Sequence, residues 1–239
     1  MTQRANELGL PIGPAVKDWQ PCNPPPHAAL HGRYCDVVPL SLDEHASDLH
    51  AANLQDEENR IWVYLGYGPF ETLDQYRQWL QENCTGGDPL FYAVVDKVTG
   101  KAGGVASYLR IDLAMGSIEV GHINLAPPLQ RTIAATEAMY LMMRHVFDDL
   151  GYRRYEWKCD ALNARSCRAA VRLGFIYEGT FRQAMVYNKR NRDSAWYSII
   201  DKEWPTIRDG FEAWLDAGNF DSEGNQHNKL GPEHVLRPR

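Results

Sequence analysis

Hydrophobic and polar residues alternate with different periods along the chain, and each period predicts a type of element. The segment from Arg131 to Leu150 is the clearest helix, because apolar residues recur in it at steps of three and four and Gly151 follows as a stop. These apolar residues are Ala135, Ala138, Met139, Met142, Val146 and Leu150. Between Tyr155 and Cys159 the period changes to two, which is typical of a half-buried strand.

Two more helices are predicted in the first half of the chain. The first runs from a strand end near Leu40 to Asn53, with Ser41 or Asp43 as its N-cap. The second opens with the cap sequence Thr72–Gln75. Residues at helical spacing form its apolar face, and they are Tyr76, Trp79 and Leu80.

Strand-like runs and one shorter helix complete the predicted elements. Three runs joined by short turns predict an antiparallel meander, over Leu90–Asp96, Gly104–Ile111 and Ser117–Leu125. A helix from Asn163 or Ala164 to Leu173 ends at Gly174. Two last strands lie near Phe175–Arg182 and Ser194–Asp201. The order β-α-α-β-β-β-α-β-α-β-β predicts a mixed α/β fold, in which one strand-helix-strand unit requires a parallel pair.

The distribution of prolines and polar residues divides the chain into three parts. Residues 1–32 form a Pro-rich N-terminal arm, because proline lacks an N–H and disfavours both helix and central strand. Residues 33–214 form the folded domain. Residues 215–239 are polar and predict a loosely ordered tail that Phe220 or Val235 anchors.

Composition excludes several classes of protein. With 239 residues, 44% of them hydrophobic, the chain can bury a core without disulfides or metal. The formal charge of −6 disfavours binding to nucleic acid, which requires a basic face. Five cysteines without a CxxC or Cys/His cluster indicate a reducing compartment and no metal site. No apolar run approaches a membrane span and no leader is evident, so we expect a cytoplasmic protein without membrane contact.

The strand Ser117–Leu125 carries an irregularity. Its apolar positions are 118 and 120 and then 123 and 125, so their parity changes at Gly121-His122. A β-bulge absorbs the extra residue, bends the strand and leaves backbone groups unpaired for a ligand. An irregular edge strand without function is the alternative explanation.

The run after this strand leads into the long helix. A helix N-terminus offers free N–H donors and about half a positive charge, which suits phosphate. The small residues Ala134, Ala135 and Thr136 permit close approach, and Arg131 adds a guanidinium that matches phosphate geometry. A helix packed through its alanines has the same pattern, so the run alone leaves both interpretations open.

Two motifs resemble those of the GNAT superfamily of N-acetyltransferases. Gln130–Ala135 is similar to its acyl-CoA pyrophosphate motif Q/R-x-x-G-x-G/A. Asn163–Ser166 with Leu173–Phe175 and Glu178-Gly179 resembles its segment N-x-x-S/A … L-G-F-x-x-E-G. The order of elements agrees over about residues 33–202, and the chain most resembles the branch that acetylates the N-terminal amines of ribosomal proteins. Ile133 replaces a motif glycine, and Ala170 stands where many members have a tyrosine acid.

The resemblance implies direct attack of a neutral amine on acetyl-CoA without a metal. It also implies a GNAT-type sheet whose fourth strand carries the bulge. Backbone groups at Ile123 and Leu125 would hold the pantetheine arm and the thioester oxygen. The other implied acetyl-CoA contacts are Gln130, Arg131, Thr132, Ile133, Ala134, Ala135, Thr136, Asn163 and Ser166. Glu119 is the first candidate for the base and His122 the second. An exposed carboxylate, a satisfied histidine and a helix-capping asparagine are the structural alternatives.

An aromatic-rich stretch, Arg60–Phe70, follows the first predicted helix. Family members place this segment beside the acceptor, so we expect Tyr64 and Tyr67, and with them Trp62 and Phe70, to shape the acceptor pocket. Packing of Trp62 and Phe70 onto the sheet is the alternative. The acidic balance favours a small amine or a cationic protein N-terminus as acceptor. The sequence leaves open whether the protein forms a homodimer.

Two other functions fit the same sequence. A noncatalytic acyl-CoA sensor would bind acetyl-CoA without releasing its thiol. An interaction domain that docks through the Pro-rich arm would not bind acetyl-CoA at all.

Overall fold

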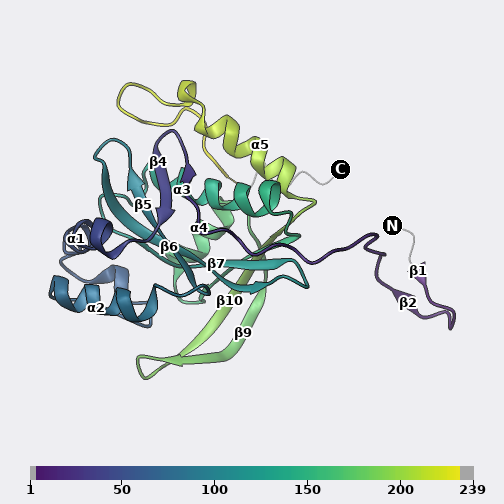
Figure 1. Cartoon of the computed structure of the whole chain (residues 1–239). Coiled ribbons are helices and arrows are strands. Elements are labelled where there is room, and N and C mark those ends of the chain that lie inside the picture. Colours follow the sequence, from purple (N-terminus) through teal and green to yellow (C-terminus); the bar gives the residue numbers. More distant parts are fainter. Residues whose placement is uncertain (1–3, 232–239) are drawn as a thin grey trace.

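The computed structural model describes residues 4–231 and has an eight-stranded sheet at its centre (Figure 1). The strand order is β3-β4-β5-β6-β7-β8-β10-β9. The strands are β3 (Leu30–His31), β4 (Cys35–Pro39), β5 (Leu90–Asp96), β6 (Lys101–Asp112), β7 (Ser117–Leu125), β8 (Arg154–Asp160), β9 (Ile176–Tyr187) and β10 (Arg190–Ile200). Every neighbouring pair is antiparallel except β7 with β8. The predicted mixed fold, mostly antiparallel with one parallel pair, is confirmed.

Helices cover both faces of the sheet (Figure 1). On one face lie α1 (Leu42–Asn53) and α2 (Leu73–Asn83), joined by the short turn η1 (Arg60–Trp62). On the other lie α3 (Ile133–Arg144), continued by a π-helical turn η2 (His145–Asp149), and α5 (Trp204–Leu215). A fifth helix, α4 (Ala164–Arg172), connects β8 to β9. Each face therefore has its own apolar core.

Local sequence signals explain where the helices begin. Ser41 caps α1, and Thr72 forms a full capping box with Gln75 at the start of α2, as predicted. The long helix begins at Ile133 rather than Arg131, because Arg131 is in the left-handed region and Thr132 is the cap. The π-helical turn replaces its expected last turn.

Several parts of the fold were not predicted from the sequence, among them the short edge strand β3, which lies within the segment expected to be an arm. Helix α5 was missed, although buried residues at helical spacing mark it, namely Trp204, Ile207, Phe211 and Trp214. The last two strands are longer than expected and form a hairpin that extends beyond the body (Figure 1). The arm contains a small hairpin of β1 (Arg4–Ala5) and β2 (Pro11–Ile12), which projects away from the sheet in Figure 1.

The second half of the arm is fixed to the body. The Trp19 indole donates to the Ala114 carbonyl at 2.9 Å, and the Tyr152 hydroxyl donates to the Asn23 carbonyl at 3.0 Å. Gly116 is required beside Trp19, because it has φ of 63° and a Cβ there would lie 2.4 Å from the indole ring. These contacts hold the arm along the end of the sheet.

The C-terminal segment also packs on the body over its described part. Phe220 lies edge-on against Trp214 and Tyr34. It follows a 3₁₀ turn, η3 (Ala217–Asn219). Val235 lies outside the described residues. Among the helices of residues 4–231, none is both long and apolar enough to cross a membrane.

A buried carboxylate joins α3 to the first strands. Glu137 accepts backbone hydrogen bonds from Arg33, Tyr34 and Cys35 at 2.8, 2.6 and 2.8 Å. Glu137 thus fixes the position of α3 across the sheet, although it follows directly on residues that the sequence assigned to acetyl-CoA binding.

Candidate active site

The parallel strands β7 and β8 separate part of the way along their length. They pair only over Ser117–Val120 and Arg154–Trp157, whereas β7 continues to Leu125 and β8 to Asp160. Beyond Val120 the edge of β7 that faces β8 therefore has no strand partner. Unpaired backbone groups at such an edge can bind an extended ligand.

The bulge in β7 lies where the sequence predicts it. On β6 the residues Val105 and Ser107 are two positions apart, and their partners on β7, Asn124 and Gly121, are three apart. His122 takes the extra position and has φ of 50°. The bulge bends β7 at the place where it leaves β8.

The start of α3 lies directly after this free edge of β7. The Thr132 hydroxyl caps the helix by accepting from the Ala135 amide, and Gln130 Nε2 donates to the Leu125 carbonyl at 2.7 Å. Within residues 4–231 the amides of Arg131, Ile133 and Ala134 have no hydrogen-bond acceptor. Together with the positive end of the helix dipole they form a turn whose free donors suit an anion.

Thr136 closes the first turn of α3 and is buried. Its hydroxyl donates to the Thr132 carbonyl and accepts from the Arg172 guanidinium at 3.2 Å. This contact brings the end of α4 against the first turn of α3. Arg165 and Arg168 lie on the same face of α4 as Arg172, at i, i+3 and i+7 spacing, and both are exposed.

Two predicted residues lie at the start of α4. The Asn163 side chain accepts from the Ser166 amide at 3.1 Å, so it fills the N-cap role that the sequence left as an alternative. The Ser166 hydroxyl accepts from the Trp157 indole at 3.0 Å. Both side chains are half-buried, and the helix that carries them follows directly after the end of β8.

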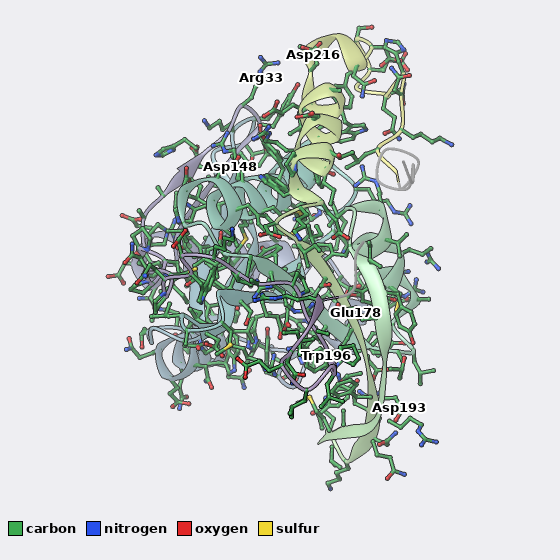
Figure 2. All side chains as sticks on the ribbon, turned by 90° about the vertical axis from the view of Figure 1, so that its right-hand side faces the viewer. Arg33, Asp148, Glu178, Asp193, Trp196 and Asp216 are labelled. Atoms are coloured by element: carbon green, nitrogen blue, oxygen red, sulfur yellow. The ribbon has the colours of Figure 1, made fainter. Side chains whose placement is uncertain are left out.

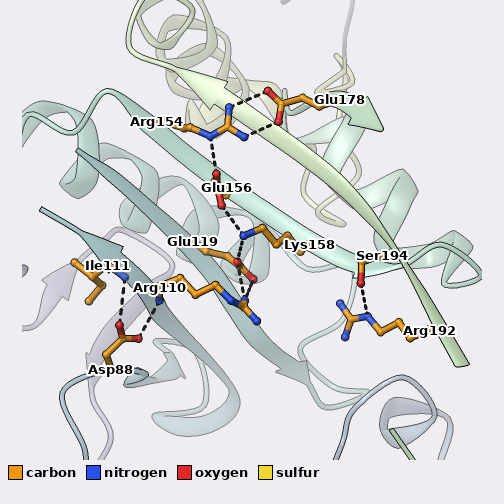
Figure 3. A network of polar contacts seen from close by, with 10 residues as sticks. All are labelled: Asp88, Arg110, Ile111, Glu119, Arg154, Glu156, Lys158, Glu178, Arg192 and Ser194. Atoms are coloured by element: carbon orange, nitrogen blue, oxygen red, sulfur yellow. Dashed lines mark hydrogen bonds and ion pairs between the residues drawn. The ribbon is translucent and has the colours of Figure 1, made fainter. Parts of the chain in front are cut away.

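A chain of ion pairs crosses the sheet on the face opposite α3 (Figure 3). It begins at Glu119, whose two oxygens each lie 2.8 Å from Nη1 of Arg110. Lys158 Nζ lies 2.8 Å from Glu119 and 2.7 Å from Glu156. Arg154 continues the chain from Glu156 to Glu178, as Figure 3 shows. The Glu119 side chain is only 4% exposed, so these ion pairs compensate for its removal from water.

Electrostatics keep the far end of this chain ionised. Burial raises the pKa of Glu156, but hydrogen bonds from Lys158 and Arg154 outweigh burial and leave that pKa below its ordinary value. The hydrogen bond from Arg154 lowers the pKa of Glu178. The Lys158 ammonium also lies 3.7 Å above the Trp196 ring, and Trp196 and Glu178 lie on the hairpin of β9 and β10 (Figure 2).

His122 belongs to an aromatic cluster rather than to the ion-pair chain. Its Nδ1 lies 3.3 Å from the Tyr67 hydroxyl, and its ring stacks on Tyr67 and lies 5.0 Å from Phe91. Burial lowers the pKa of His122, and nearby Arg110 lowers it further. The imidazole is therefore neutral at physiological pH.

The aromatic stretch of residues 60–70 forms the rest of this cluster. Trp62 is buried and packs edge-on against Tyr67 and Phe70, whereas Tyr67 stacks on Trp79 with ring centres 4.1 Å apart. The Tyr64 hydroxyl donates to the Leu162 carbonyl at 3.1 Å, next to the start of α4. The structure therefore brings Tyr64 beside Asn163 and Tyr67 beside His122.

The tip of the β9–β10 hairpin closes on the same stretch. Asn188 donates to the Leu65 carbonyl at 3.1 Å, and Arg190 donates to the Val63 carbonyl at 2.6 Å. The stretch is thus held between the hairpin, α2 and the bulge. These contacts could not be inferred from the sequence, because they depend on how far the hairpin extends.

Arg110 and Lys158 bind Glu119, and sequence reasoning singled out neither of them. The sequence contained a signal for Lys158, since Glu156 and Lys158 alternate with the apolar residues of their strand and must share one face. Arg110 carried no such signal. Its φ of 49° and the Asp88 carboxylate that binds its amide place its side chain at Glu119.

Known proteins match both the sequence and the fold of this chain. A family model described as an acetyltransferase (GNAT) domain matches residues 37–176. A GCN5-related N-acetyltransferase from Brucella melitensis is 43% identical, with a TM-score of 0.89 over 92% of this chain and 99% of that chain. A probable acetyltransferase of the GNAT family from Chromobacterium violaceum is 40% identical, with a TM-score of 0.76 over 82% and 98%.

A more distant match shares the fold. The microcin C7 self-immunity acetyltransferase MccE, whose structure contains acetyl-CoA and AMP, is 22% identical, with a TM-score of 0.63 over 73% of this chain and 97% of that chain. No curated protein matches the sequence.

Proposed function

The chain belongs to the GNAT acetyltransferase family and is an acetyl-CoA-dependent acetyltransferase, and we propose that its acceptor is a primary amine. The amine is either a small molecule or a protein N-terminus, as in the ribosomal-protein branch that the motifs resemble. The observation that carries this proposal is the free edge of β7 running from the bulge at His122 to the turn with free amide donors at the start of α3. One end of that edge suits a phosphate and the other a reacting carbonyl.

The residues present fit acetyl-CoA. The pyrophosphate would accept from the amides of Arg131, Ile133 and Ala134, with the Arg131 guanidinium as an added cation. Ile133 keeps this donor although its side chain replaces a glycine, because the donor is a backbone group. Gln130 and Thr132 support the turn through the Leu125 carbonyl and the Ala135 amide.

The pantetheine arm would lie in the opening between β7 and β8. Backbone groups at Ile123 and Leu125 would hold it from one side, and Asn163 and Ser166 from the other. A donor near the bulge would also polarise the thioester carbonyl as charge develops on its oxygen. Ala135 and Thr136, which are buried in the first turn of α3, would line the floor of the phosphate site.

His122 fits the role of proton acceptor better than Glu119. Both oxygens of Glu119 lie 2.8 Å from a cation, Arg110 or Lys158, so taking up a proton would cost the carboxylate an ion pair. The imidazole of His122 is neutral, and when its Nδ1–H donates to the Tyr67 oxygen, Nε2 has no partner among the described residues. We assign to Glu119 the positioning of Arg110 and Lys158.

The acceptor would approach past the aromatic stretch. Tyr64 lies beside the start of α4 and Tyr67 beside the proposed base, so both border the path of an amine to the thioester. Aromatic faces attract an ammonium before it loses its proton. Trp62 and Phe70 support this wall from behind, through edge-on packing.

The proposal is tested by calorimetry with acetyl-CoA followed by thiol release over a panel of acceptors. The panel pairs each primary amine with its N-acetylated form, which keeps the rest of the molecule. The proposal expects binding of acetyl-CoA and thiol release only with free amines. Binding without release for every amine would indicate a sensor, and absence of binding would indicate an interaction domain; either result would overturn the proposal.

A further inference from the structure

Two cysteines from different elements lie in contact beside the proposed acetyl-CoA site. The sulfur of Cys159 on β8 is 3.7 Å from the sulfur of Cys167 on α4. All five cysteines of the chain lie in the described residues and all are free thiols. The other three, Cys22, Cys35 and Cys84, have carbonyl, carboxylate or aromatic neighbours and no sulfur contact.

The position of this pair connects it to the active site. Cys167 directly follows Ser166, whose hydroxyl binds the Trp157 indole, and Cys159 lies two residues after Trp157 on the same face of β8. Asn163 caps the same helix one turn earlier. A change at the two sulfurs therefore acts on the turn of α4 that faces the opening.

We propose that Cys159 and Cys167 form a reversible disulfide when the protein meets a peroxide, and that this bond weakens acetyl-CoA binding. The first half of the proposal stands on the contact between the sulfurs. The second half rests on the proposed function, since it assumes that Asn163 and Ser166 hold the pantetheine arm.

The reaction balances with hydrogen peroxide as oxidant. Cys167 is half-buried and more accessible than Cys159, and burial raises the pKa of the Cys159 thiol to about 12. The Cys167 thiolate therefore attacks the peroxide first, which forms a sulfenic acid and releases hydroxide. The Cys159 sulfur then displaces the sulfenic oxygen as water. In total, two thiols and one peroxide give one disulfide and two waters.

Bond formation requires movement of α4. A disulfide has a sulfur–sulfur distance of about 2.05 Å, so the two sulfurs must approach by about 1.7 Å. Cys159 is held in the sheet by pairing with Ala195 on β10, so α4 is the element free to shift. This shift moves Ser166 against Trp157 and displaces the start of α4 from the position it has in the reduced protein.

The experiment uses the full chain treated with hydrogen peroxide, alkylated under denaturing conditions and digested with trypsin. Cleavage after Lys158, Arg165 and Arg168 places the cysteines on separate peptides, 159–165 and 166–168. We expect these two peptides to be joined, and to separate after treatment with dithiothreitol. Calorimetry on the same samples should show several-fold weaker acetyl-CoA binding after oxidation and recovery after reduction.

Matched variants separate the two halves of the proposal. Cys167→Ala should abolish the joined peptides and keep acetyl-CoA affinity unchanged by peroxide, whereas Cys22→Ser should behave as wild type. If peroxide leaves both cysteines of wild type as thiols, or converts them only to sulfinic or sulfonic acids, the proposal is overturned. This outcome does not depend on the acetyltransferase activity. Joined peptides with unchanged affinity would overturn its second half. Failure to bind acetyl-CoA in the reduced protein would instead contradict the proposed function.

Discussion

Glu119 on β7 lies directly opposite Glu156 on β8 in the parallel pair, and the ammonium of Lys158 bridges the two carboxylates at 2.8 and 2.7 Å. Like charges in such a cross-strand pair repel one another. The bridging lysine, together with Arg110 and Arg154, turns this repulsion into a connected network across the paired part of the two strands (Figure 3). The network thus holds β7 and β8 together just before they part.

Replacing the bridging lysine tests the structural role of this network. Lys158→Met keeps the length of the side chain and removes its charge, so two buried carboxylates face each other. We expect the free energy of unfolding at pH 7 to fall by about 3–5 kcal/mol. Because repulsion favours protonation of one carboxylate in the variant, the difference from wild type should shrink as the pH falls toward and through about 4. A constant difference across this range, measured by denaturant unfolding, would contradict the electrostatic explanation.

The assignment of His122 as the base is tested by comparing two variants. His122→Ala should lower kcat by roughly 10²–10⁴-fold with little change in acetyl-CoA affinity. Glu119→Gln should lower the free energy of unfolding, because Arg110 and Lys158 lose a partner. The kcat of its folded fraction should depend on pH as that of wild type does. If Glu119→Gln instead removes the acidic limb of the rate profile, the base is Glu119.

The pH dependence follows from the direction of the His122 shift. A lowered pKa keeps the imidazole neutral, and able to accept a proton, down to a pH below its ordinary value of about 6.5. The acidic limb of the plot of kcat against pH, which reports protonation of His122, should therefore lie below pH 6.5 and be absent from His122→Ala. The free energy of unfolding should also fall at acidic pH. As the pH falls below about 6.5, His122 takes up a proton in the unfolded chain but stays neutral in the native state, and this difference favours unfolding.

Charge reversal at the start of α3 tests the phosphate site. Arg131→Glu places a carboxylate beside the proposed pyrophosphate and should weaken acetyl-CoA binding several-fold through like-charge repulsion. Lys202→Glu makes the same change of charge at an exposed turn after β10 and should leave the affinity unchanged. Equal effects of the two variants would point to net charge instead of a local site.

The acceptor wall is tested by two aromatic residues that differ in burial. Tyr64→Ala should raise the KM for the acceptor, while acetyl-CoA affinity and thermal stability stay unchanged. Trp62→Ala empties a buried site and should lower the free energy of unfolding by about 3–5 kcal/mol. A loss of stability in Tyr64→Ala with an unchanged KM would identify this residue as part of the core.

Local patterns predicted the part of the fold that positions the site. The run Ser117–Leu125 is a strand with its bulge at His122, because a change of parity has no other explanation inside a continuous strand. Ser41, Thr72 and Asn163 act as caps, because the side-chain oxygen of each accepts a hydrogen bond from the backbone at the start of its own helix. Such signals act within a few residues of the chain.

Interactions between distant segments were beyond the reach of the sequence. The environment of Glu119 depends on the registers of β6 and β8, which bring Arg110 and Lys158 to it from two different strands. Glu137 follows directly on the phosphate motif but binds the backbone of residues 33–35, about a hundred positions away. The pairing of Cys159 with Cys167 likewise required the placement of α4 against β8.

The position of the acetyl group in the product is the sharpest test that this protein transfers acetyl from acetyl-CoA to the nitrogen of a primary amine. The protein is incubated with acetyl-CoA and a basic peptide that has one free α-amine and one serine, and the peptide is fragmented in a mass spectrometer. We expect a single acetyl group on the α-nitrogen, formed by wild type and formed far more slowly by His122→Ala. Acetyl on the serine oxygen would contradict transfer to an amine. So would a protein that binds acetyl-CoA but acetylates neither the peptide nor any small primary amine.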